Sequence, residues 1–110
     1  MAAAIRLLLH MMSSDDPRTR AEGADGVTGS LGDDLSAHEA TTLAQALVAL
    51  RMVEPDARCQ ESQLHALAEL AEWLLVPPEA VAQLRCIDDA TVMGSQVEYL
   101  ERIFRTTSGG

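Results

Sequence analysis

Three pairs of adjacent aspartates have the residue types and spacing most suggestive of chemistry: Asp15–Asp16, Asp33–Asp34 and Asp88–Asp89. Paired carboxylates can bind divalent cations or share a catalytic proton. Each pair here stands at the start of a predicted helix, where an aspartate side chain caps free backbone N–H groups. The nearby segment GADGVTGSLGDD fits neither a calcium-binding loop nor a phosphate-binding loop. We therefore interpret the pairs as helix caps and predict no metal site.

The chain also contains three histidines and two cysteines: His10, His38, His65, Cys59 and Cys86. No two histidines have the i, i+4 spacing of metal ligands on one helix. A thiolate near a helix N-terminus can act as a nucleophile. Cys59, however, aligns with Val92 in an internal repeat, and Cys86 ends an apolar segment, so both thiols are expected to be buried and inert. The sequence predicts no catalytic residue, no enzymatic activity and no cofactor.

The composition limits the classes of partner. The chain has 110 residues and a net charge of −9, and all its basic residues apart from histidine are arginines. This charge repels the phosphates of nucleic acids and of anionic lipids, and it favours a basic protein partner. No segment approaches the ~18 apolar residues of a membrane span, and the N-terminus lacks the pattern of a signal peptide. We expect a cytoplasmic protein that is monomeric when free.

An internal repeat organises the chain. DARCQESQLHALAEL, from Asp56, and DATVMGSQVEYLERI, from Asp89, share Asp, Ala, Ser, Gln and Leu at the same positions. A first, weaker copy precedes them, and it aligns Asp16 with Asp56 and Leu7 with Leu47. Each copy has the pattern of a helix, a short break and a second helix. The sequence thus predicts one all-α domain over 1–110, with units at about 2–34, 35–75 and 76–105 and a flexible tail at 106–110.

Apolar spacing places the same stripe on the second helix of each unit. The stripe is Leu64, Leu67, Ala71 and Leu74 in the second unit, Val97, Leu100 and Phe104 in the third, and Ala24, Val27 and Leu31 in the first. The spacing i, i+3, i+7, i+10 is that of one helix face. We expect helices near 2–13, 17–31, 36–53, 56–75, 78–86 and 89–105.

The segment 17–31 has an alternative interpretation. Its three glycines would each cost roughly 1 kcal/mol inside a helix, which favours a loop from Gly23 to Asp34. The repeat favours a helix instead, because the first unit needs one at this position. The spacing of three between the glycines would then let a neighbouring helix approach closely.

The breaks between the paired helices resemble those of a known repeat family. Asp16-Pro17-Arg18 in the first unit and Asp56-Ala57-Arg58 in the second are similar to the breaks of HEAT-type repeats. The resemblance implies three stacked antiparallel helix pairs in a HEAT-like right-handed α-solenoid. The third unit departs from the pattern, because Thr91 replaces the arginine and its first helix is short. These departures suit a terminal cap.

The second helices carry a predicted partner-binding surface. Asp25, His65 and Glu98 are equivalent in the repeat and lie off the apolar stripe. The predicted surface, here called the acidic ridge, consists of Glu22, Asp25, Glu61, His65, Glu69, Glu72, Trp73, Glu98 and Glu101. Trp73 is expected to be partly buried, with an exposed edge that would anchor a partner. The alternative is an acidic face that serves only solubility.

The small size, acidity and helical repeats are similar to those of HEAT-like proteins encoded beside bacterial polymorphic toxins. This resemblance implies an immunity protein that binds a cognate toxin domain, which would be basic if it acts on nucleic acid. The inference is an analogy, since HEAT-like folds serve many functions. The alternative is a HEAT-like adaptor or regulatory subunit of a housekeeping complex. A helical-repeat glycosylase would need a basic groove, which the sequence lacks.

Overall fold

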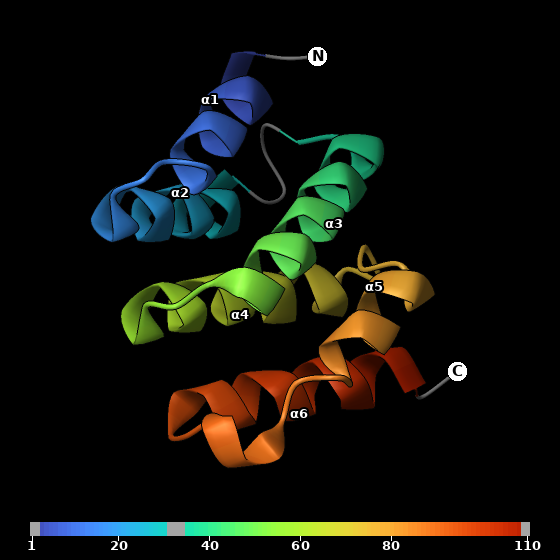
Figure 1. The fold of residues 1–110 in the computed structure, drawn as a ribbon. Helices are drawn as coiled ribbons and strands as arrows, with labels where there is room; N and C mark the ends of the chain where they lie inside the picture. Colours follow the sequence, from blue (N-terminus) through green and yellow to red (C-terminus); the bar gives the residue numbers. More distant parts are fainter. Residues whose placement is uncertain (1–2, 31–34, 109–110) are drawn as a thin grey trace.

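The computed structural model describes residues 3–30 and 35–108, and all regular structure within them is helical (Figure 1). The elements are α1 (Ala3–Met12), α2 (Pro17–Ser30), α3 (Ala37–Val53), α4 (Ala57–Glu72), α5 (Pro78–Leu84), the 3₁₀ turn η1 (Asp89–Thr91) and α6 (Ser95–Ser108). The predicted all-α class is confirmed. Leu31 and the pair Asp33–Asp34 lie outside the described residues. None of the described helices is long and apolar enough to cross a membrane.

Side-chain caps explain where several helices begin. Ser36 Oγ accepts a bond from the Glu39 amide (3.1 Å), and Glu39 Oε1 accepts one from the Ser36 amide (3.1 Å). This reciprocal capping box starts α3, as the sequence predicts. Asp16 Oδ2 accepts from the Thr19 amide (3.2 Å) at the start of α2. Asp88 Oδ1 accepts from the amide of the second residue of η1 (3.0 Å). The cap interpretation is therefore confirmed for one member of each described aspartate pair.

The helices form two layers. In one layer α2, α4 and α6 lie side by side with α4 in the middle, and in the other α3 lies between α1 and α5 (Figure 1). The shortest dimension of the molecule is 19 Å, against 37 and 34 Å for the others. This thickness matches two helix layers of about 10 Å each. Leu64, Leu67 and Leu70 of the central helix α4 are fully buried.

Two of the three glycines in α2 allow α1 to approach. A Cβ added at Gly23 would lie 2.9 Å from Met12 N and from Met11 Cβ. A Cβ at Gly26 would lie 2.6 Å from Leu8 Cδ2, whereas one at Gly29 would meet nothing within 4 Å. The helical interpretation is thus correct through Ser30, and the loop alternative is wrong over the described part of this segment.

The end of α4 differs from the prediction. The helix ends at Glu72 and not at 75, and Leu74 has a φ of 60°. The Leu75 amide donates to Leu70 O (3.1 Å) and the Leu74 amide to Ala71 O (2.9 Å). These two bonds define a Schellman motif, which reverses the chain direction. Leu74 is consequently 77% exposed instead of completing the apolar stripe.

The last helix also differs from the prediction. Its expected start at 89 is occupied by η1, and α6 begins only at Ser95, after Gly94 (φ 61°). The repeat aligns Asp89 with Asp56, the N-cap of α4, and therefore predicted a helix start at 89. In the structure a short 3₁₀ turn occupies this position. At the other end α6 continues through 106–108, which the sequence assigned to a flexible tail. Residues 109–110 lie outside the described part of the chain.

The two cysteines differ in burial. Cys59 is fully buried in α4, as predicted, whereas Cys86 is exposed. The prediction for Cys86 is wrong because α5 ends at Leu84, so the thiol lies beyond the packed part of that helix.

Candidate functional site

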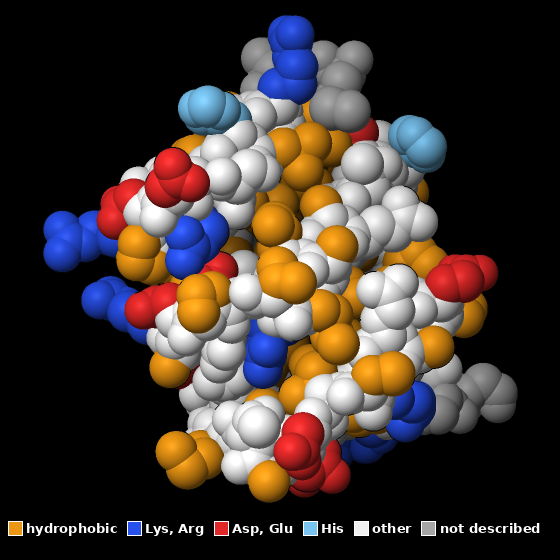
Figure 2. Space-filling model, viewed as in Figure 1, with side chains coloured by type: hydrophobic (Ala, Val, Ile, Leu, Met, Phe, Trp, Pro, Cys, Tyr) orange, Lys and Arg blue, Asp and Glu red, His pale blue; other side chains and the backbone are white. Residues whose placement is uncertain are grey.

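The acidic ridge occupies the solvent-facing side of the layer formed by α2, α4 and α6. Its exposed residues are Glu22 and Asp25 on α2, Glu61 and Glu72 on α4, Trp73 just after α4, and Glu98 and Glu101 on α6; His65 and Glu69 are half-buried. Because the three helices are neighbours, the fold brings these side chains onto adjacent parts of one surface. The face that carries α3 is different: charged side chains lie mainly around its margin, and hydrophobic ones lie between α1 and α3 (Figure 2).

An arginine neutralises part of the ridge at the contact between α4 and α6. Arg102 Nη2 donates to Glu69 Oε1 (3.4 Å) and also to Glu72. Hydrogen bonding, first to Glu72 and then to Glu69, raises the pKa of Arg102. On the same contact the His65 ring stacks on Tyr99 (5.0 Å between centroids), and His65 Nε2 lies 3.6 Å from Glu69 Oε1. These contacts join the two helices, so Glu69 and Glu72 are less available to a partner than Glu61 and Glu98.

A hollow of about 600 Å³ lies between the N-terminal ends of α2 and α4. Both copies of the repeated break motif contribute to it: its lining is Asp16, Pro17, Arg18, Ala21, Glu22, Asp25, Asp56 and Arg58. Exposed arginines thus alternate with exposed carboxylates at this end of the ridge. Such a mixed surface suits charged side chains of both signs on a protein partner better than a simple anion or cation.

Trp73 is the largest apolar side chain of the candidate surface. Trp73 is 60% exposed, more than the sequence predicts, because α4 ends at Glu72 and Trp73 is its C-terminal cap. The neighbouring Leu74 is 77% exposed. Exposed tryptophans frequently become the energetic centre of a protein interface. Trp73 and Leu74 are thus two consecutive exposed apolar residues that directly follow Glu72.

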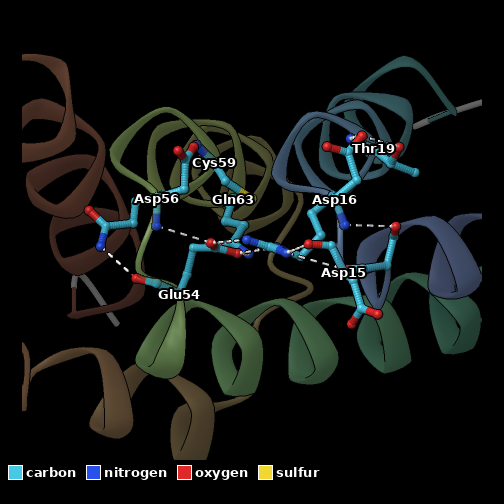
Figure 3. A network of polar contacts seen from close by, with 10 residues as sticks. Asp15, Asp16, Thr19, Glu54, Asp56, Cys59 and Gln63 are labelled. Carbon is cyan, nitrogen blue, oxygen red and sulfur yellow. Dashed lines mark hydrogen bonds and ion pairs between the residues drawn. The ribbon is translucent and has the colours of Figure 1, made fainter.

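A buried ion pair that sequence reasoning missed lies between α2 and the α3–α4 junction (Figure 3). Arg20 Nε donates to Glu54 Oε1 (2.8 Å) and Nη2 to Oε2 (2.7 Å), a bidentate arrangement. The Glu54 side chain is 3% exposed and also accepts from Gln63 Nε2 (3.2 Å) and from the Asp56 amide (3.1 Å). A buried carboxylate needs such partners to offset its loss of hydration.

The polar network continues into the third unit. Gln60 Nε2 donates to Glu54 O (2.7 Å), and Gln96 Nε2 donates to Gln60 Oε1 (3.4 Å). Arg51 Nη2 donates to Gln96 Oε1 (3.3 Å). Gln63 and Gln96 are the glutamine that both copies of the repeat share, and each is buried. The sequence feature that could have indicated this network is the glutamine repeated at one position of two otherwise apolar helix faces.

The electrostatics of the network fix its charges. Burial by itself would raise the pKa of Glu54, but Arg20, Cys59 and the Asp56 amide lower it to about 2. The bond to Glu54 raises the pKa of Arg20. Burial, followed by the nearby Glu54 carboxylate, raises the pKa of the Cys59 thiol to about 12. None of these groups changes protonation near neutral pH, which suits a structural role better than acid–base or nucleophilic chemistry.

The described residues contain no group of three or more His, Cys, Asp or Glu side chains that could hold a metal ion. Comparisons of the chain with protein-family models, with curated proteins and with solved structures gave no match.

Proposed function

We propose that the chain is a HEAT-like right-handed α-solenoid without catalytic activity, which acts as an immunity protein. It would neutralise a cognate bacterial toxin domain by direct binding in the cytoplasm, and it would be monomeric when free. The toxin domain is expected to be basic and to act on nucleic acid. The observation that supports this proposal is the acidic ridge, whose carboxylates lie on three adjacent helices of a chain with a net charge of −9.

The chemistry of such a complex follows from the two surfaces. A domain that acts on nucleic acid carries basic side chains to bind phosphates, and these attract the carboxylates of the ridge. Long-range attraction raises the association rate, while desolvated contacts slow dissociation. Glu61 and Glu98 suit the first role because they are exposed. Trp73 suits the second because its large ring can be buried by the partner.

Neutralisation is tested by co-expression. The open reading frame next to the gene in its native genome is expressed in a heterologous host with and without this chain. A reading frame whose product arrests growth alone, but not with this chain, supports the immunity function. Growth arrest in both cases, or no toxic neighbour, would instead favour an adaptor that uses the same surface.

The interface is tested by association kinetics with the rescued toxin domain at low and high salt. The double variant Glu61→Lys and Glu98→Lys should associate more slowly and bind more weakly by about 2 kcal/mol if the contacts are desolvated. The control Asp15→Lys and Glu79→Lys changes the net charge equally, at exposed positions outside the ridge. Equal effects of the two double variants would show that only net charge matters and that recognition lies elsewhere. Circular dichroism verifies the fold of each variant.

A further inference from the structure

An apolar groove runs along the end of the helix stack formed by α5, η1 and α6. One part, of about 560 Å³, is lined by Val92, Val97, Leu100 and Phe104 together with Arg85, Asp89 and Glu101. A second part, of about 410 Å³, is lined by Leu74, Val76, Pro78, Val81, Ala82, Arg85, Thr106 and Thr107. Arg85 belongs to both parts, and its guanidinium carbon lies 4.4 Å from the centre of the Phe104 ring. We call the two parts together the end groove.

The internal repeat shows that the end groove is an incompletely covered copy of a surface that is buried elsewhere in the molecule. Leu64 and Ala71 of α4 are fully buried. Their equivalents in α6 are Val97, which is 37% exposed, and Phe104, which is half-buried. The difference has a simple cause: α4 has a neighbour in its own layer on each side, α2 and α6, whereas α6 has only α4 among the described helices.

The first part of the end groove lies on the side of α6 that faces away from α4. Tyr99 and Arg102 make the contacts with α4. The groove residues Val97, Glu101 and Phe104 follow the spacing i, i+4, i+7, which places them on a separate face of the same helix. This first part therefore lies where one more helix would extend the layer of α2, α4 and α6.

We propose that the end groove binds an amphipathic α-helix of a partner protein whose apolar stripe is flanked by basic residues. The first part of the groove follows α6 from Val97 to Phe104, about 10 Å at 1.5 Å per residue, and the second part continues past Arg85 along α5. This length accommodates two to three helical turns, with apolar anchors at i, i+3 or i+4, and i+7. The apolar lining favours such a stripe over an extended polar segment.

Charge selects a basic helix over a second copy of this chain. Asp89 and Glu101 line the groove, and Glu98 is exposed on the same helix. The positive charge of Arg85 lies over the Phe104 ring, a cation–π contact that holds it in place. Two copies with a net charge of −9 each would repel one another. The inference does not require the partner to be a toxin, and among the residues that line the groove only Glu101 belongs to the acidic ridge.

The test uses three synthetic 18-residue peptides and ¹⁵N-labelled full-length protein. The first peptide is a helix with leucines on one face and lysines elsewhere. The second has the same composition but a scrambled order without an apolar stripe, and the third has glutamate in place of lysine. Calorimetry gives the affinities, and NMR chemical-shift changes locate the site. The first peptide should bind at least about tenfold more tightly than either of the others, with the largest shifts at 92–107.

Two variants with matched controls separate the groove from general surface attraction. Val97→Ser should weaken binding of the leucine–lysine peptide about fivefold, whereas Val53→Ser, at a valine that is 75% exposed at the end of α3, should leave it unchanged. Glu101→Lys should weaken binding of the basic peptide and strengthen binding of the acidic one. Glu22→Lys on α2 makes the same charge change away from the groove, and it should leave the affinities for the basic and the acidic peptide unchanged.

Several results would overturn the proposal. Equal binding of the striped and scrambled basic peptides would show that charge alone attracts them. Equal binding of the basic and acidic helices would refute the basic partner. Shifts confined to α1 and α3 would place the site on another face. Failure of the peptides to bind the groove would leave the toxin-binding function intact, because that function is tested separately by co-expression and by the double variant at Glu61 and Glu98.

Discussion

Leu74, just after the end of α4, has a φ of 60°. Residues other than glycine rarely adopt this left-handed backbone conformation. The left-handed conformation costs roughly 1–2 kcal/mol for a residue other than glycine. Leu74 is 77% exposed, so burial of its side chain does not repay this cost. Strain of this kind is often retained where a residue serves function, and Leu74 lines the end groove beside the exposed Trp73.

The change Leu74→Gly should therefore raise the free energy of unfolding by about 0.5–1 kcal/mol, since glycine relieves the strain but gains entropy when unfolded. Leu74→Ala keeps the strain and should change stability by less than about 0.5 kcal/mol. Urea denaturation measures both variants. Equal stabilities for the glycine and alanine variants would show that the strain is negligible. The glycine variant should also bind the leucine–lysine peptide more weakly, because the groove loses an apolar side chain.

Glu54 should make the free energy of unfolding of the protein depend on pH in the acidic range. Its pKa is about 2 in the folded protein, below its ordinary value of 4.5. A lowered pKa means that the carboxylate stabilises the fold fully above pH 4.5, and that this contribution disappears as the pH falls from 4.5 towards 2. We expect a loss of about 3 kcal/mol from this group over that range.

The variant Glu54→Gln tests this assignment. Near neutral pH it should be less stable than the wild type by roughly 3 kcal/mol, because Arg20 stays partly buried without its charged partner. Between pH 4.5 and 2 its stability should fall less steeply than that of the wild type. Parallel stability curves for the two proteins would assign the acid sensitivity to other carboxylates.

The sequence did not reveal this pair because a lone Arg or Glu is usually a surface residue. Arg20 and Glu54 are separated by 34 residues, and only the packing of α2 against the α3–α4 junction makes them meet. The repeated glutamine was the available signal, since Gln63 and Gln96 keep a polar group at one buried position in two units. Exposed carboxylates were easier to predict, because their distance from the apolar stripe determines their exposure.

At the scale of elements, α2 contains glycines with two different roles. Gly23 lies so close to α1 that a Cβ would be 2.9 Å from the Met12 backbone nitrogen, which cannot move aside easily. Gly29 has nothing within 4 Å of its added Cβ. Gly29→Ala should therefore stabilise the protein by up to about 1 kcal/mol, the gain in helix propensity. Gly23→Ala should destabilise it by about 1–3 kcal/mol through overpacking.

Thermal and urea denaturation of both variants provide the comparison, and each variant acts as the control of the other. They make the same change of composition in the same helix. Destabilisation by Gly29→Ala would show that this end of α2 is strained or frayed. Stabilisation by Gly23→Ala would show that α1 can move away from α2 without loss of packing.

Helix starts with a side-chain cap were the most predictable helix boundaries. Ser36, Asp16 and Asp56 cap through local hydrogen bonds that a short stretch of sequence encodes. The early end of α4 and the late start of α6 depend on left-handed residues, Leu74 and Gly94. The leucine carries no such local signal, since glycine is the residue expected there. The repeat misled at η1, because equivalent sequence positions need not have equivalent caps.

At the scale of the whole molecule, the position of the candidate surface follows from the order of the helices. Because α2, α4 and α6 lie side by side, a pattern repeated along the chain becomes a surface that crosses the molecule (Figure 1). The repeat therefore predicted which side chains share a face. The repeat did not predict that Arg102 forms ion pairs with Glu69 and Glu72, because these contacts depend on how far α6 is shifted along α4.

The central position of α4 predicts how stability is distributed over the molecule. This helix packs against α2, α3 and α6, whereas α5 has seven residues and η1 three. Backbone amides in α4 should exchange with solvent only through global unfolding, and those of α5 and η1 through smaller openings. Native-state hydrogen exchange monitored by NMR measures these free energies residue by residue.

The buried network predicts how the units are coupled. Arg20 is the α2 residue that bonds to Glu54, and Glu54 is linked to Gln96 of the third unit indirectly, through Gln60. Glu54→Gln should therefore accelerate exchange in α2 more than in α4 or α6, because its first effect is to weaken the attachment of the first helix pair. Glu79→Gln, an exposed change on α5, should alter no helix except α5. An equal increase in all helices after Glu54→Gln would mean that the ion pair contributes to global stability but does not join one unit to the next.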